Sequence, residues 1–341
     1  MILPLFRWEV LMALANIVIL GTGGTITGVG AHPLAMTVYN AGELDIHQVV
    51  AGIPQLHERA NITTEQFTKL GAFNASFELW IDLAERVNTL LADSKVDGVV
   101  ITHGTDTLED TAYFLNLVVK SEKPVVITGS MRPASALCAE GPLNIYNAVC
   151  IAASKQAIGK GVLVAFNDEI HAAREVTKTN TSNVSTFKSF NTGPIGIVSN
   201  GEPIFYLASI RRHTFNSEFS VDSKTNFPAV KVLYFHINED TALLEAALAA
   251  GVQGIVYVGT GNGNLAGAVA RPLRSAVANG LTLVRATRVT GGIVATSVTK
   301  WDELGYIAAD NLNPSKARIL LMLALLQTTE PSEIRRIFAE Y

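Results

Sequence analysis

Residues 99–119 read VVITHGTDTLEDTAYFLNLVV, and this stretch decides the fold class. Its first three residues are apolar and end at a turn of small and polar residues, which is typical of a buried strand. Beyond the turn, the apolar side chains of Leu108, Ala112 and Leu115 recur at helical spacing. Thr107 stands just before them as a candidate helix cap. A strand followed by a helix in this way indicates an α/β fold with a mostly parallel sheet.

The same alternation extends along the chain. Further short apolar runs end at turn residues at positions 17–20, 125–127 and 162–164. A second group of runs begins near Val230 and covers residues 232–235, 255–258 and 283–284. A final pair of helices is predicted to open with Asn313 as the cap and Pro314 in the first turn.

We therefore predict two α/β domains. The larger, N-terminal domain covers residues 16–206 and contains a mostly parallel sheet, and the smaller C-terminal domain covers residues 230–341 and also contains a parallel sheet. Residues 207–229 are polar and irregular, and we interpret them as a linker.

The charge balance disfavours a nucleic-acid binder. The 341 residues include 26 Lys+Arg and 30 Asp+Glu, a formal net charge of −4, whereas nucleic-acid binders show a basic excess.

The longest apolar run, residues 319–326, is far shorter than the roughly 20 residues of a spanning helix, so no membrane segment is predicted. Residues 1–15 are apolar but carry Arg7 and Glu9, which makes a poor secretory signal. We interpret residues 1–11 as an upstream extension, with Met12 as an alternative start. Residues 13–15 (ALA) also resemble a cleavage site, so a leader stays open.

The two cysteines, Cys138 and Cys150, are interpreted as buried thiols. They have no metal-type spacing, and two are too few for a disulfide framework.

The loop after the first strand is rich in glycine. Residues 21–28 read GTGGTITG, and the dinucleotide pattern G-x-G-x-x-G fails because its third glycine position is Ile26. What remains is a loop that presents the hydroxyls of Thr22 and Thr25, either to a substrate or to backbone groups of a tight turn.

The loop after the strand at 99–101 concentrates polar groups. Residues 102–107 carry three hydroxyls, the His103 imidazole and the Asp106 carboxylate, although ordinary helix capping would need only one of them. His103 by itself is interpreted as a structural histidine. Lys178 stands between two threonines in a stretch of low charge, and it is either solvated or buried beside Asp106.

Together these segments resemble the bacterial-type L-asparaginase and glutaminase-asparaginase family. The resemblance runs from Asn16 to Tyr341. Besides the Thr25 loop, the motif HGTD at 103–106 and TKT at 177–179, it rests on matching stretches at residues 130–133 (SMRP), 141–148 (GPLNIYNA), 259–264 (GTGNGN) and 312–318 (LNPSKAR).

The resemblance implies hydrolysis of a small-molecule amide, the side chain of asparagine, without metal or cofactor. It makes Thr25 the nucleophile and places Tyr39 beside it, on a segment from 25 to 39 that we expect to close as a lid. Thr105, Asp106 and Lys178 form the second catalytic group, in which Lys178 is either a base or a fixed charge. Further substrate-binding positions implied by the family are Gly24, Ala72, Phe73, Gly104, Ser130 and Asn264.

The chain departs from the family where the amino-acid end of the substrate is read. Ala72 and Phe73 stand where the family has a serine and a glutamine or glutamate, and residues 298–299 lack the glutamate that a neighbouring subunit contributes. Asparagine, glutamine or a related ω-amide without an α-amino group therefore stay open as substrates. A relative that binds amino acids without turnover is the alternative from another class.

The resemblance also implies a homotetramer built as a dimer of dimers. Secreted members of the family carry a disulfide in the first domain, but Ser94 and Ser121 stand near its expected places. We therefore expect a cytoplasmic protein and leave the periplasm open.

Overall fold

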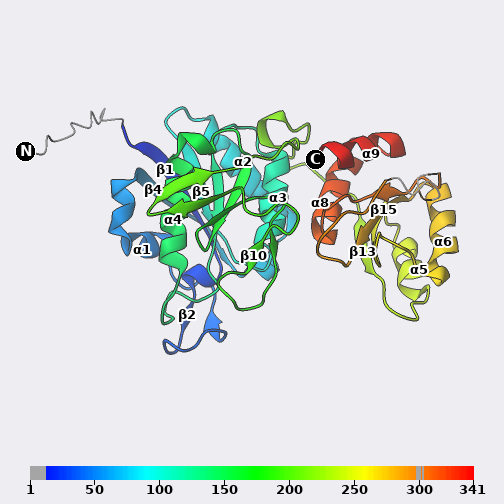
Figure 1. Cartoon of the computed structure of the whole chain (residues 1–341), viewed down its shortest axis with the longest axis horizontal. Coiled ribbons are helices and arrows are strands. Elements are labelled where there is room, and N and C mark those ends of the chain that lie inside the picture. Colours follow the sequence, from blue (N-terminus) through cyan, green and yellow to red (C-terminus); the bar gives the residue numbers. More distant parts are fainter. Residues whose placement is uncertain (1–12, 297–300, 302) are drawn as a thin grey trace, which may run out of the picture.

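The computed structural model describes residues 13–296, 301 and 303–341, which form two lobes side by side (Figure 1). The expected N-terminal extension and the position of the missing glutamate, residues 298–299, lie outside the described residues. Among the described residues, no helix is both long and apolar enough to cross a membrane.

The first lobe is built on an eight-stranded sheet. Its order is β12-β11-β8-β7-β6-β5-β1-β4; the pairs from β4 to β7 are parallel, and β8, β11 and β12 add antiparallel pairs at one end. The strands are β1 (Ala15–Gly23), β4 (Ala60–Leu70), β5 (Gly98–Thr102), β6 (Val125–Thr128), β7 (Val162–Phe166), β8 (Glu169–Ala172), β11 (Gly196–Ser199) and β12 (Glu202–Phe205).

Helices cover both faces of this sheet. Side chains alternate along each strand, so Val18 and Leu20 of β1 join one core while Ile17 and Ile19 join the other. The first core is shared with α2 (Phe77–Ala92) and α3 (Leu108–Val118), and the second with α1 (Ile46–Ala51) and α4 (Gly141–Ala153). Burial on both faces explains why the central strands are apolar runs without polar alternation.

The second lobe has a four-stranded parallel sheet of order β13-β14-β15-β16. Its strands are β13 (Val230–Tyr234), β14 (Gly254–Gly259), β15 (Thr282–Thr287) and β16 (Ile307–Ala308), and its helices are α5 (Ala242–Ala249), α6 (Gly267–Ala278), α8 (Pro314–Leu325) and α9 (Pro331–Glu340). As predicted, Asn313 caps α8 by accepting a hydrogen bond from the backbone N–H of Lys316, and Pro314 opens the helix. The predicted fold class, two α/β units with parallel sheets, is confirmed.

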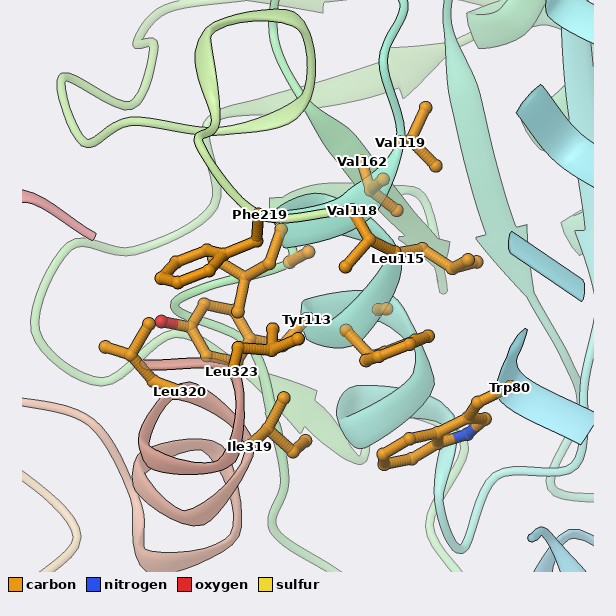
Figure 2. Close-up of a cluster of buried hydrophobic side chains, with 14 of the residues drawn as sticks. Trp80, Tyr113, Leu115, Val118, Val119, Val162, Phe219, Ile319, Leu320 and Leu323 are labelled. Carbon is orange, nitrogen blue, oxygen red and sulfur yellow. The ribbon is translucent and has the colours of Figure 1, made fainter. Parts of the chain in front are cut away.

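The core that joins the lobes lies between α3 and α8. Tyr113 on α3 packs beside Leu320 and Leu323 on α8, and all three are fully or almost fully buried (Figure 2). Helix α8 also packs against β13, β14 and β15 of its own sheet, so it belongs to both hydrophobic layers at once. A shift of α8 would therefore open apolar surface in both lobes, which costs roughly 25 cal/mol per Å².

Residues 207–229 connect the two sheets and do not hang free. Phe219 is buried against Tyr341, and the backbone N–H of Glu218 donates to the Tyr341 hydroxyl at 2.7 Å. The domain boundaries themselves stay a prediction.

Two local expectations are wrong. Cys138 is exposed, because it lies in a surface loop with a backbone φ of 55°; only Cys150 is buried. Thr107 occupies the N-cap position of α3, but its hydroxyl donates to the Ala72 carbonyl at 2.9 Å and makes no cap hydrogen bond. The hydroxyl is directed toward a distant acceptor and away from the N–H donors of its own helix.

Candidate active site

Four loops meet at one edge of the large sheet. They follow β4, β1, β5 and β6, which are neighbours in the sheet and parallel, so their carboxyl ends lie side by side. In open α/β sheets this edge is where ligands bind. The strand order therefore gathers residues 71–74, 24–28, 103–107 and 129–133 in one place.

The loops after β1 and β5 touch through glycines. Gly24 has φ 83°, and a Cβ added to it would lie 2.4 Å from the Gly104 Cα. A Cβ on Gly104 would lie 2.7 Å from the Ala72 Cβ. Both substitutions would push backbone segments apart, so glycine at these positions is what allows the three loops to close together.

Thr25 and Tyr39 form the first polar pair of the site. Their hydroxyl oxygens lie 2.7 Å apart, and Thr25 is 8% exposed. Tyr39 comes from the short hairpin of β2 (Val29–Gly30) and β3 (Tyr39–Asn40), and its ring lies against Gly28. The phenol is thus an immediate hydrogen-bond partner of the threonine hydroxyl, at a distance over which a proton can pass.

Lys178, Thr105 and Asp106 form the second polar group. The Lys178 ammonium donates to the Thr105 hydroxyl at 2.9 Å and to an Asp106 carboxylate oxygen at 2.7 Å. Lys178 lies on β9 (Thr177–Lys178), which pairs with β10 (Phe187–Lys188) outside the main sheet. Of the two readings of Lys178, the structure supports the one beside Asp106, since the lysine side chain is only 18% exposed.

His103 is structural, as expected. The indole N–H of Trp80 donates to the Thr111 hydroxyl, the Thr111 hydroxyl to His103 Nε2, and His103 Nδ1 to the Gly104 carbonyl. Burial lowers the pKa of His103, which favours the neutral ring that this chain of bonds requires. Thr22 is structural as well, since its hydroxyl donates to the Thr102 backbone carbonyl at 2.9 Å.

The remaining predicted binding residues are placed unequally. Ala72 lies against Gly104 at the centre of the loops, whereas the neighbouring Phe73 side chain is 73% exposed. Ser130 is fully buried and its hydroxyl donates to the Arg132 carbonyl. Asn264 follows β14 in the second lobe, and within the described part of the chain no hydrogen bond connects it to the first-lobe cluster.

The segment between Thr25 and Tyr39 is fastened to a neighbouring loop. Gly30 N–H donates to the Ser135 hydroxyl at 2.8 Å, Ala134 N–H to the Gly28 carbonyl at 2.9 Å, and Leu137 N–H to the Pro33 carbonyl at 2.8 Å. These bonds hold Tyr39 over Thr25 in the conformation described.

One buried residue behind the site escaped sequence analysis. Glu109 accepts hydrogen bonds from the Thr177 hydroxyl, the Lys178 backbone N–H and the Asn313 side-chain amide. From the sequence it suited the positive end of a helix, which is a sufficient local reason for a carboxylate there. Its partners lie 68 or more residues away, so no local signal pointed to them.

The arrangement offers two hydroxyls, each beside a group able to exchange its proton. A threonine hydroxyl next to a phenol is a nucleophile with a proton acceptor, and a second hydroxyl next to an ammonium can hold or polarise water. Acyl transfer from an amide, followed by hydrolysis, is the chemistry that such a pair can carry out.

Comparison with known proteins agrees with this chemistry. The N-terminal domain of asparaginases matches residues 16–211, and the C-terminal domain of glutaminases and asparaginases matches residues 229–338. L-asparaginase 2 of Bacillus subtilis is 46% identical, covering 96% of this chain and 87% of its own. A probable periplasmic L-asparaginase of Haemophilus influenzae is 44% identical over 96% and 93%. The crystal structure of a probable cytoplasmic L-asparaginase from Campylobacter jejuni superposes with a TM-score of 0.92 at 44% identity, covering 96% of this chain and 100% of that one. The chain therefore belongs to the asparaginase and glutaminase-asparaginase family, as its motifs indicated.

Proposed function

We propose that this protein hydrolyses the side-chain amide of L-asparagine to L-aspartate and ammonia, with Thr25 as the nucleophile. The observation that carries the proposal is the 2.7 Å contact between the Thr25 and Tyr39 hydroxyls. Membership of a family whose similar proteins are named L-asparaginases supports the substrate.

In the first step Thr25 Oγ attacks the amide carbon as its proton passes to the Tyr39 oxygen, and Tyr39 gives its own hydroxyl proton to the amide nitrogen. The C–N bond breaks and ammonia leaves with that proton, so an ester of Thr25 remains. In the second step water, held by Thr105 and the Lys178 ammonium, attacks the ester. One proton of the water restores the Thr25 hydroxyl through Tyr39, and the other leaves with the product acid, which ionises to the carboxylate and converts ammonia to ammonium. Backbone N–H groups at the loop turns stabilise each oxyanion, a contribution often worth roughly 3–4 kcal/mol per donor.

The test removes one hydroxyl at a time from the glycine loop. Thr25→Val replaces the nucleophile by a methyl group of similar shape, and Thr22→Val does the same to a threonine three residues away whose hydroxyl bonds only to backbone. We expect wild type and Thr22→Val to release ammonia from asparagine, and Thr25→Val to lose at least about 10⁴-fold in kcat. Turnover by Thr25→Val would exclude the proposed nucleophile. A wild-type protein that releases no ammonia from any ω-amide would be a binding relative.

A second substrate class is favoured by Ala72 and Phe73. Ala72 presents a methyl group to the loop cluster and Phe73 extends into solvent, so neither offers a polar side chain to an α-amino or α-carboxylate group. Two missing hydrogen bonds to charged groups would cost roughly 3–6 kcal/mol, or about 10²- to 10⁴-fold in kcat/KM. If this holds, succinamate, which has no α-amino group, is hydrolysed at least as efficiently as asparagine. A kcat/KM for asparagine far above that for succinamate would exclude the class.

We also propose that the site is completed by a partner subunit in a homotetramer, because Asn264 lies in the second lobe and away from Thr25. Dilution monitored by sedimentation and ammonia release tests this, since activity should fall as the assembly dissociates. We place the protein in the cytoplasm by similarity to the Campylobacter jejuni protein, and cell fractionation distinguishes this from the periplasmic placement of the Haemophilus influenzae relative.

A further inference from the structure

The position of the Lys178 amine depends on the short strand that carries it, β9, which is bonded on the side away from the site. The two-residue strand β9 is not part of the large sheet, so its position depends on the contacts that it makes with β10 and with α3. Both residues of β9 bond to a single carboxylate: Thr177 donates its hydroxyl to both Glu109 oxygens at 2.9 Å, and Lys178 donates its backbone N–H to the same group.

The same carboxylate reaches the second lobe. The side-chain amide of Asn313 donates to Glu109 at 2.7 Å, while its oxygen accepts from the Lys316 N–H at 2.9 Å and so caps α8. We call Glu109, Thr177 and Asn313 the interlobe anchor. It ties the first turn of α3, the strand that carries Lys178, and the first turn of α8 to one point.

The surroundings of the anchor are rigid on one side and open on the other. Lys316, which is fully buried, donates its ammonium to the carbonyls of Ala173, Arg174 and Val176 just before β9. The apolar core between α3 and α8 fixes the two helices that carry Glu109 and Asn313 (Figure 2). Next to the anchor a cavity of about 260 Å³ lies between the lobes, so β9 has room to move once its acceptor is lost.

We propose that Glu109 is a positioning residue that sets the place of the Lys178 amine at Thr105 and Asp106 and makes it depend on the seating of α8. This inference rests on the proposed function only for its kinetic consequence. A charged acceptor serves three donors at this point, and a glutamine would replace one carboxylate oxygen by an NH₂ group that faces donors instead. The Lys178 backbone would then lose its acceptor and shift toward the cavity.

The chain supplies a matched control at the same junction. Glu175 accepts from the Asn311 side-chain amide at 2.7 Å and from Arg174 at 2.7 Å, which is a second Glu–Asn pair between the lobes. No hydrogen bond described for Glu175 involves Lys178. Glu175→Gln therefore weakens the junction to a similar extent without touching the strand that carries the amine.

The experiment compares Glu109→Gln with Glu175→Gln in the full chain, by crystal structures and by steady-state ammonia release from asparagine. For Glu109→Gln we expect the Lys178 ammonium to leave its 2.9 Å contact with Thr105, kcat to fall about 10- to 100-fold and KM to change by less than about threefold. For Glu175→Gln the contact and both constants should stay close to wild type. If Glu109 only stabilised the fold, kcat would instead fall by a similar factor in both variants.

A second variant keeps the test valid if Glu109→Gln does not fold. Asn313→Ser retains a good helix cap but loses the amide that reaches Glu109, so kcat should fall in the same direction by a smaller factor. The inference is overturned if the Lys178 contacts with Thr105 and Asp106 persist in the crystal structure of the Glu109→Gln or Asn313→Ser protein. If wild type releases no ammonia from asparagine, the proposed function fails. The inference about Glu109 is then decided by the distance between the Lys178 ammonium and the Thr105 hydroxyl in the variant structures.

Discussion

Replacing Tyr39 by phenylalanine separates a catalytic phenol from one that only holds its neighbour. The change removes a single oxygen, the one 2.7 Å from the Thr25 hydroxyl, and keeps the ring that packs against Gly28. Because three hydrogen bonds fasten the segment between Thr25 and Tyr39 to the loop at 134–137, this segment should keep its place without the phenol.

The two roles differ in magnitude. A neutral hydrogen bond that merely orients Thr25 has a net value of roughly 0.5–1.5 kcal/mol, which corresponds to at most about a tenfold loss. A phenol that takes the Thr25 proton in the transition state contributes about 10²- to 10⁴-fold, or roughly 3–5 kcal/mol in activation free energy. We therefore expect Tyr39→Phe to lower kcat by at least about 100-fold, with little change in KM.

The assay is steady-state ammonia release with saturating asparagine, together with thermal unfolding to show that the fold is intact. Tyr146→Phe is the control. The Tyr146 hydroxyl lies on α4 and accepts a hydrogen bond from Arg59 Nε at 2.8 Å, so its removal should lower stability without changing kcat. A Tyr39→Phe protein that keeps kcat within tenfold of wild type would refute the proton-transfer role and leave Tyr39 as an orienting group.

Two further predictions concern backbone geometry and pH. Gly24→Ala should abolish most activity, because its Cβ would lie 2.4 Å from the Gly104 Cα; Gly159→Ala, also at positive φ but with open space around it, should cost only about 1–2 kcal/mol in unfolding free energy and no activity. Burial raises the pKa of Asp110 to about 7 from 3.8, so the folded chain holds a proton that the unfolded chain releases, and stability falls as pH rises from about 4 to 7. The asparagine of Asp110→Asn cannot ionise. In urea unfolding this variant should therefore be more stable than wild type at pH 8, by as much as about 3–4 kcal/mol, and similar to wild type at pH 4. Equal unfolding free energies at pH 8 would contradict the shifted pKa.

Local patterns predicted much of this molecule. Apolar runs that end at turn residues identified β1, β5, β6 and β7. A strand whose two faces are both buried needs apolar side chains at every position, so the run itself is visible in the sequence. The Asn313–Pro314 start of α8 was equally readable, since capping depends on neighbouring residues alone. The motifs around Thr25, Thr105 and Lys178 indicated the family, and the comparisons confirmed it.

Other features depended on partners distant in the chain. Thr107 was expected to cap its own helix, but the Ala72 carbonyl, 35 residues earlier, takes its hydroxyl. Cys138 was expected in the core, but the loop that carries it runs over the surface. Glu109 satisfied a local rule for helix starts, and that rule hid its bonds to Thr177 and Asn313.

The sequence by itself determined which segments become strands and helices and which polar groups follow each strand, because periodicity and capping act over a few residues. Only the tertiary structure decided that β4, β1, β5 and β6 are neighbours, that Tyr39 lies over Thr25, and that Lys178 meets Thr105 from 73 residues away. These contacts form when strand pairing and helix packing close long loops, and the free energy that selects one closure over another belongs to the whole core rather than to any stretch of the chain.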